Sequence, residues 1–105
     1  MRLIPELMVA DTFWKRSIGL MGKPGLKAGQ GLLLSPCGSI HTCFMRFPID
    51  IIFLDSQNRV IKIRQNVVPW RLVRGGWKAR SVIEVQSGWL APLPCIGSHL
   101  DHFRP

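Results

Sequence analysis

Short apolar segments separated by turn-forming residues predict a chain of short β-strands. In some segments apolar and polar residues alternate, and in others the apolar residues are consecutive. The 10 glycines and 8 prolines fall between the segments at short intervals, as turns require. Outside a central hairpin, the pattern predicts strands at Glu6–Ala10, Gly31–Ser35, Ser39–Met45 and Ser81–Gln86, and an exposed loop at Arg71–Lys78.

The central hairpin is the clearest predicted element. Asp50–Asp55 contains an uninterrupted apolar run, which is typical of a strand covered on both faces. Ser56–Asn58 supplies turn residues, and Arg59–Arg64 returns with alternating apolar and basic positions. The side chains expected to be largely buried are those of Ile51, Phe53, Ile61 and Ile63.

One short helix is predicted across Thr12–Met21. Trp14, Ile18 and Met21 recur at the spacing of one helix face, and Gly22 suits the C-terminal cap. The elements together predict a mainly β (α+β) fold. We expect a single domain, residues 1–105, of about seven short strands and one short helix, rolled up into a small β-barrel.

Length and composition agree with a folded domain. A chain of 105 residues that is 47% hydrophobic can bury a core and is too apolar for disorder. A last short strand is expected to dock through Leu100 and Phe103. The odd number of cysteines, without C-x-x-C spacing, indicates three small buried hydrophobes: Cys37, Cys43 and Cys95.

The N-terminus does not resemble a signal peptide, because Pro5 and Glu6 interrupt its apolar residues. No segment approaches the ~20 apolar residues that a membrane-spanning helix needs. We therefore expect a cytoplasmic protein without a membrane span.

The charge of the chain is strongly positive and unevenly placed. Its 14 basic and 6 acidic residues give a net charge of +8, which favours anionic partners. The stretch between Asp55 and Glu84 contains basic residues and no acidic one, with Trp70 and Trp77 among them. This combination is typical of surfaces that bind nucleic acid or another polyanion, although a solvated basic face with both tryptophans in the core is the alternative. The candidate polyanion contacts are Arg71, Arg74 and Lys78.

Catalytic signatures do not stand out. The chain has no phosphate-binding glycine loop, nucleophile elbow or H-E-x-x-H motif, so an enzyme is not favoured, and no cofactor is predicted. Asp50 is interpreted as a turn cap after Pro48 or, alternatively, as a carboxylate at a pocket rim beside Arg46. A small-molecule or protein ligand would then occupy a cleft lined by His41, Arg46, Pro48, Asp50 and Trp70.

A metal site is a further alternative on the strand Ser39–Met45. Alternation places Phe44 with Ile40 on one face of the strand. The other face then carries an imidazole nitrogen, a thiolate and a thioether. Such donors suit a soft ion such as Cu(I). The candidate ligands are His41, Cys43 and Met45.

Several motifs, taken in order, resemble domain-of-unknown-function family 192. They are Gly19-Leu20-Met21, Gly31-Leu32-Leu33-Leu34, Phe44-Met45-Arg46-Phe47-Pro48-Ile49-Asp50, Val68-Pro69-Trp70-Arg71 and Ile83-Glu84-Val85-Gln86-Ser87-Gly88. The resemblance implies a compact β-rich fold with one short helix, and it brings no established activity. The function expected is that of a small non-enzymatic binding or accessory domain.

Overall fold

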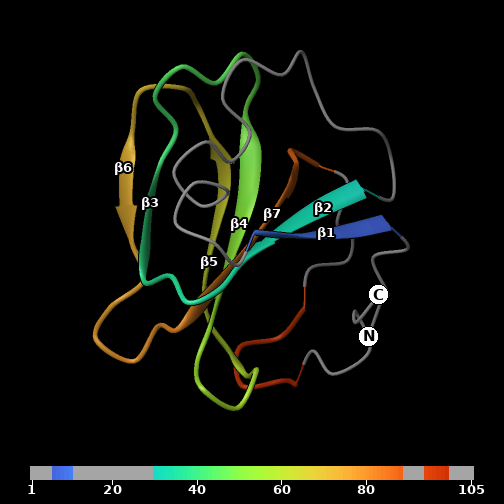
Figure 1. The fold of residues 1–105 in the computed structure, drawn as a ribbon, viewed down its shortest axis with the longest axis vertical. Helices are drawn as coiled ribbons and strands as arrows, with labels where there is room; N and C mark the ends of the chain where they lie inside the picture. Colours follow the sequence, from blue (N-terminus) through green and yellow to red (C-terminus); the bar gives the residue numbers. More distant parts are fainter. Residues whose placement is uncertain (1–5, 11–29, 89–93, 100–105) are drawn as a thin grey trace.

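Seven β-strands make up the regular structure of residues 6–10, 30–88 and 94–99, which this computed structural model describes (Figure 1). They are β1 (Glu6–Ala10), β2 (Gln30–Leu34), β3 (Ser39–His41), β4 (Ile49–Leu54), β5 (Val60–Val67), β6 (Leu72–Arg74) and β7 (Ser81–Gln86). The strands predicted at the positions of β1 and β7 are confirmed with the same bounds. The predicted helix at Thr12–Met21 and the last strand near Leu100 and Phe103 lie outside the described residues.

The strands form two separate sheets. One has five strands in the order β1-β2-β7-β4-β5, and β3 and β6 form the other. β1 and β2 run parallel, whereas the other neighbouring pairs are antiparallel. The mainly β fold is therefore confirmed, but the closed barrel is wrong for the described strands. Closure would require β1 to pair with β5, and the strand order leaves the two at opposite edges of the five-stranded sheet, while β3 and β6 pair only with each other.

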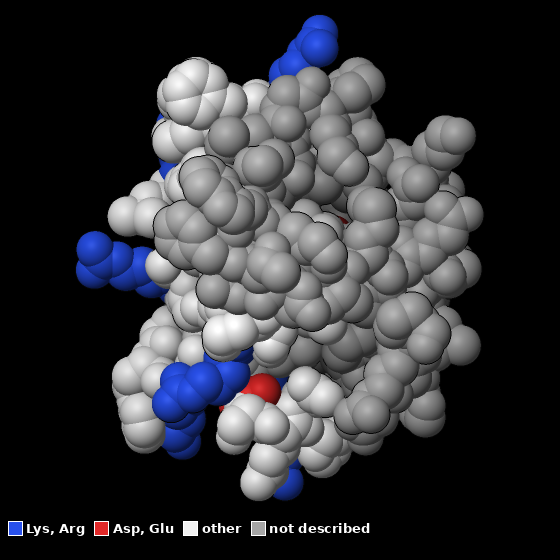
Figure 2. All heavy atoms as spheres, in the orientation of Figure 1, with Lys and Arg blue, Asp and Glu red and all other residues white. Residues whose placement is uncertain are grey.

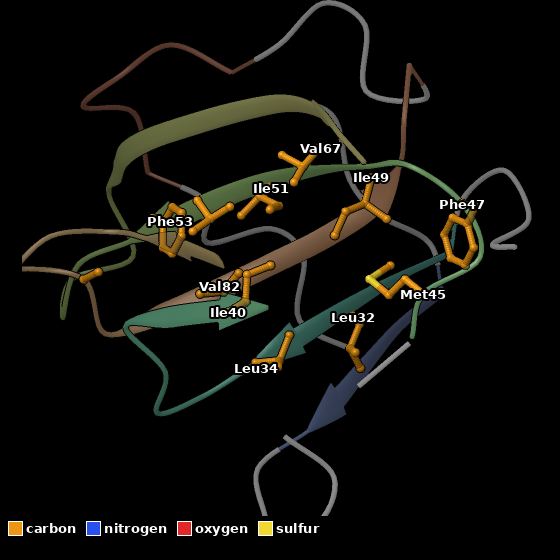
Figure 3. Packing of buried hydrophobic residues seen from close by; sticks show 12 residues of the cluster. Leu32, Leu34, Ile40, Met45, Phe47, Ile49, Ile51, Phe53, Val67 and Val82 are labelled. Carbon is orange, nitrogen blue, oxygen red and sulfur yellow. The ribbon is translucent and has the colours of Figure 1, made fainter. Parts of the chain in front are cut away.

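The main apolar core includes side chains from both sheets (Figure 3). Ile40 of β3 and Val73 of β6 belong to the same buried cluster as Ile49, Ile51 and Phe53 of β4. A second cluster takes the alternate residues of β4 and β7, which are Ile52, Leu54, Ile83 and Val85, together with Val60 of β5. Both faces of β4 and β7 are thus covered, which explains their consecutive apolar residues.

β4 and β5 form the predicted hairpin, with Ser56–Asn58 in the turn between them. Asp55 holds this turn, because its Oδ1 accepts hydrogen bonds from the backbone nitrogens of Gln57 (2.9 Å) and Arg59 (2.9 Å). On β4 the predicted burial is confirmed, because Ile51 and Phe53 are fully buried. On the edge strand β5 the burial is only partial, because Ile61 and Ile63 are half-buried.

Two predictions between β2 and β7 need correction. The strand expected at Ser39–Met45 ends at His41, because the chain turns at Phe44, where φ is 63°. The loop expected at Arg71–Lys78 contains β6, which pairs with β3. A strand as short as β6 leaves almost no periodicity in the sequence.

The cysteines are less buried than predicted. Cys37 and Cys43 are half-buried and Cys95 is exposed, so the expectation of three core cysteines is wrong. The described residues contain no helix that is long and apolar enough to cross a membrane.

Candidate functional site

Thr42 joins the segment after β3 to the segment before β6. Its side chain is fully buried, and its hydroxyl donates to the carbonyl oxygen of Val68 (2.7 Å) and accepts from the backbone nitrogen of Arg71 (2.8 Å). The Thr42 carbonyl accepts hydrogen bonds from the backbone nitrogens of Trp70 (3.1 Å) and Met45 (3.2 Å). Because β3 and β6 are antiparallel, both segments lie at the same end of the small sheet (Figure 1), and this one residue fixes both.

Phe44 and Trp70, carried by these two segments, form an exposed aromatic pair. Their ring centroids lie 4.8 Å apart with the planes at 61°, and the residues are 62% and 59% exposed. Both have a positive φ, 63° and 68°, which for a bulky residue is rare and costs on the order of 1–3 kcal/mol. The hydrogen bonds of Thr42 offset this cost, so the fold holds two large rings in solvent.

The aromatic pair lies at one end of the outer face of the β3–β6 sheet. Ile40 and Val73 are paired across the two strands and point into the core. The next pair, His41 and Leu72, is therefore exposed, and Leu72 is 64% exposed. Grouped apolar side chains in solvent are typical of interaction sites. We call the following residues the aromatic–cationic surface: Phe44, Trp70, Leu72, Arg46, Arg71 and Arg74.

Exposed carboxylates are scarce among the described side chains. Asp50 is 1% exposed and Glu84 is 3% exposed, which leaves Asp55 in the hairpin turn. The described basic side chains are exposed, apart from the half-buried Lys62. Figure 2 shows Lys and Arg atoms projecting at the margin of one face, with a small group of Asp or Glu atoms beside one of them. The resulting positive potential favours anionic ligands.

Both tryptophans of the basic stretch are on the surface. Trp77 is 82% exposed, and the ammonium nitrogen of Lys78 lies 5.1 Å from the centroid of its ring. Trp70 is followed by Arg71, whose guanidinium donates to the Trp70 carbonyl oxygen (3.4 Å). The alternative that placed both tryptophans in the core is therefore wrong. Arg71 and Arg74 lie near Trp70 along the chain, and Lys78 lies beside Trp77.

The strand face that motivated a soft-metal site does not form. His41 is exposed and Met45 is buried in the core, because the strand ends between them. The Nδ1 atom of His41 accepts a hydrogen bond from the backbone nitrogen of Cys43 (3.2 Å). No group of three or more His, Cys, Asp or Glu side chains in the described ranges is placed to hold a metal ion.

Asp50 is part of the interior and not of an open rim. Its Oδ1 accepts a hydrogen bond from the backbone nitrogen of Asn66 (2.8 Å), and its Oδ2 accepts one from that of Gly88 (3.0 Å). Asp50 thus binds the backbone amides of two distant segments, so the predicted cap of a local turn after Pro48 is wrong. Pro48 is half-buried and Arg46 is exposed. Of the residues predicted to line the cleft, Asp50 is therefore buried, whereas His41, Arg46 and Trp70 are exposed.

Glu84 is a buried acid in the middle of β7. It pairs across the sheet with Leu32 and Ile51, both members of the main apolar cluster. Loss of water around the carboxyl raises its pKa to about 8. Glu84 is therefore mostly protonated at neutral pH and adds little negative charge to the molecule.

Sequence reasoning did not assign a functional role to Phe44, Thr42 or Glu84. Phe44 was expected to share a strand face with Ile40, because the positive φ at Phe44, which turns the chain, has no signature in the alternation. Glu84 did carry a signal, because it is an acid within a strand that is covered on both faces.

Comparison with known proteins agrees with the small, mainly β architecture. Residues 3–100 match the DUF192 family, described as "Uncharacterized ACR". A UPF0127 protein of Pyrococcus horikoshii is 40% identical over 86 residues, covering 79% of this chain and 74% of the relative. A UPF0127 protein of Pyrococcus furiosus is 34% identical over 103 residues, covering 94% and 88%. The chain belongs to the DUF192 family, a family of unknown function, as its motifs predicted.

Two solved structures share the fold. A protein of unknown function from Novosphingobium aromaticivorans aligns with a TM-score of 0.72 at 25% identity, over 78% of this chain and 63% of that one. The chain thus spans less than two thirds of that protein. A protein from Sinorhizobium meliloti, described as a proposed transcription regulator, aligns with a TM-score of 0.73 at 20% identity, over 79% and 69%. That second likeness shows the fold alone.

Proposed function

We propose that this chain is a non-enzymatic binding domain for single-stranded nucleic acid, with the aromatic–cationic surface as its binding site. The observation that carries the proposal is the Phe44–Trp70 pair, two large rings held in solvent on a left-handed backbone. Exposed rings in a strained conformation have a cost that a purely structural role does not explain.

The chemistry of the surface matches both parts of a single-stranded ligand. Unpaired bases stack on aromatic side chains, and each stacked base contributes about 1–3 kcal/mol to affinity in proteins that bind single-stranded nucleic acid. Arg71 is the neighbour of Trp70 in sequence, and Arg46 is two residues from Phe44. Guanidinium groups at these positions supply the positive charge that phosphates require. Duplex nucleic acid keeps its bases stacked and offers no free ring faces to the pair.

The burial of acidic groups strengthens the proposal. Asp50 is enclosed by backbone amides, and Glu84 is buried and mostly protonated at neutral pH. Neither carboxyl group faces the aromatic–cationic surface as an exposed charge that would repel phosphate. Absence of oligonucleotide binding in the experiment below would instead favour the alternative of a small-molecule or protein ligand.

Fluorescence polarisation with a labelled oligothymidylate of about 12 nucleotides tests the proposal at low salt. We expect saturable binding by the wild type and a loss of about 5- to 100-fold in affinity for Phe44→Ala and for Trp70→Ala. Ile96→Ala is the matched control, because Ile96 is 63% exposed and lies on another segment. Heparin, a polyanion without bases, should compete weakly.

Two results would overturn the proposal. Absence of binding at low salt would exclude a nucleic-acid ligand. Binding that Phe44→Ala and Trp70→Ala leave unchanged, and that heparin displaces as well as unlabelled oligonucleotide does, would show attraction by charge alone.

A further inference from the structure

We infer that the binding surface continues along β6 to Trp77, so that the ligand is an extended strand held at two aromatic positions. This inference rests on the proposed function and specifies the ligand as a polymer and not as a single nucleotide. Trp70 precedes β6 and Trp77 follows it, so the two residues lie beyond opposite ends of this strand.

Trp77 is built for contact with a ligand. It is 82% exposed, more than any other large apolar side chain in the described ranges. The guanidinium of Arg80 donates to the carbonyl oxygens of Trp77 (2.8 Å) and Ala79 (3.0 Å), which ties down the loop. The ammonium of Lys78, 5.1 Å from the ring centroid, adds a cation beside the ring face. Trp77 and Lys78 are thus a second exposed tryptophan followed in sequence by a cation, as Trp70 is followed by Arg71.

The path between the two tryptophans is fixed by the core. Gly75, at the end of β6, lies so close to the Phe53 ring and to Ala79 that a Cβ atom would overlap both. The ammonium of Lys62 donates to the carbonyl oxygen of Arg74 (2.6 Å) and holds the same point. The loop that carries Trp77 therefore leaves the sheet from an anchored position.

The length of β6 sets the size of the ligand. A strand rises about 3.3 Å per residue, so the Cα atoms of Leu72 and Arg74 are roughly 7 Å apart, and Trp70 and Trp77 lie beyond them on either side. A single base stacked on the Phe44–Trp70 pair does not reach across this distance. A longer strand passes the exposed side chains of Leu72 and Arg74 on its way to Trp77.

A length series of oligothymidylates tests the inference on the full chain. Oligomers of about 2 and about 12 nucleotides are compared, the short one by competition against the labelled long one. For Trp77→Ala we expect a loss of about 5- to 50-fold in affinity for the long oligomer and no change for the short one. For Trp70→Ala we expect a loss for both. Trp77 is exposed, so its replacement should leave the far-ultraviolet circular dichroism and the melting temperature unchanged.

The outcomes separate the inference from the function on which it rests. If Trp70→Ala weakens binding of the long oligomer and Trp77→Ala does not, the extended site is wrong and the aromatic pair remains the binding site. If no oligomer binds, both proposals are wrong. If Trp77→Ala weakens the short oligomer as much as the long one, the two tryptophans do not act as separate positions, and the inference is again wrong.

Discussion

Glu84 shows how one residue can make the stability of the whole fold depend on pH. Its carboxyl group sits between Leu32 and Ile51 on the core face of the five-stranded sheet, with 3% of the residue exposed. An ionised carboxylate in such surroundings has lost its water and gains little in return. The neutral acid is tolerated there, which is why the pKa rises to about 8.

The free energy of unfolding should therefore fall as pH rises. The unfolded chain releases the Glu84 proton near the ordinary value of 4.5, whereas the folded chain keeps it until about 8. The contribution of Glu84 to the free energy of unfolding is fully present below about pH 4.5. It declines between pH 4.5 and 8 by about 1.4 kcal/mol per pH unit and changes no further above pH 8. Urea unfolding at pH 5.5, 7 and 8.5 measures this decline in the wild type and in Glu84→Gln.

The Glu84→Gln variant separates this carboxyl from other titrating groups. Its amide has nearly the same shape and cannot ionise. The stability of the variant relative to the wild type should therefore increase as pH rises, because only the wild type loses the Glu84 contribution. Parallel pH profiles for the two proteins would show that Glu84 is not protonated in the fold.

Asp50 and Asp55 bind backbone amides in different ways, which predicts different responses to the same substitution. Asp50 uses both oxygens, one for Asn66 and one for Gly88, whereas Asp55 uses Oδ1 alone for both of its amides. An asparagine at position 50 directs its NH2 group at one backbone N–H, which then stays unsatisfied. Asp50→Asn should cost about 1–3 kcal/mol.

Asp55→Asn is the matched control, because its remaining oxygen can accept both hydrogen bonds and the residue is near the solvent. Thermal and urea unfolding of the two variants gives the comparison. Equal losses would mean that the two-oxygen geometry of Asp50 is not what stabilises the junction of β4, β5 and β7.

At the level of elements, the β3–β6 sheet depends on the hydroxyl of Thr42. Thr42→Val keeps the shape of the side chain and leaves the Val68 carbonyl and the Arg71 amide without their partner. We expect a loss of about 1–3 kcal/mol in stability. We also expect weaker binding of oligothymidylate, because the turns that hold Phe44 and Trp70 lose their link.

Thr42→Ser tests whether the hydroxyl or the methyl group matters. Serine restores the hydrogen bonds, so it should recover most of the binding while giving up some packing in the core. The order wild type, serine, valine in oligonucleotide affinity supports the assignment. A valine variant that binds like wild type would contradict it.

The elements that could be predicted are those that leave a clear pattern in their own residues. β4 and β7 are covered on both faces and have consecutive apolar residues, and the hairpin turn at Ser56–Asn58 has the residues that turns need. β6 has three residues and forms by pairing with β3, so only a distant contact defines it. The barrel was wrong for the same reason, since pairing between distant strands decides closure.

The candidate site was partly visible in the sequence. The basic stretch and its tryptophans indicated a polyanion surface, and the structure places Trp70 and Trp77 in solvent. Phe44 could not be assigned, because a left-handed residue reverses the alternation on which the prediction depended. The single domain of residues 1–105 and the cleft around His41 stay predictions.

At the scale of the whole molecule, charge and aromatic contact are separable contributions to binding. The net charge of +8 acts on any polyanion, whereas the rings act only on free base faces. Charge therefore governs how affinity depends on salt, and stacking governs how affinity depends on the ligand. A titration over a range of salt concentrations distinguishes cations that touch phosphate from those that only raise the potential.

The slope of log affinity against log salt should thus identify the phosphate contacts. Each cation that neutralises a phosphate of a single strand contributes about 0.7 to the magnitude of this slope, because it displaces a counterion. Arg71→Gln and Arg74→Gln should each lower the slope by about 0.7. Trp70→Ala should lower affinity at every salt concentration and leave the slope unchanged. Arg59→Gln, in the hairpin turn away from β6, is the charge-matched control and should keep the wild-type slope. If all three arginine variants reduce the slope equally, the ligand is held by the general positive field of the molecule and not by the face formed by β3 and β6.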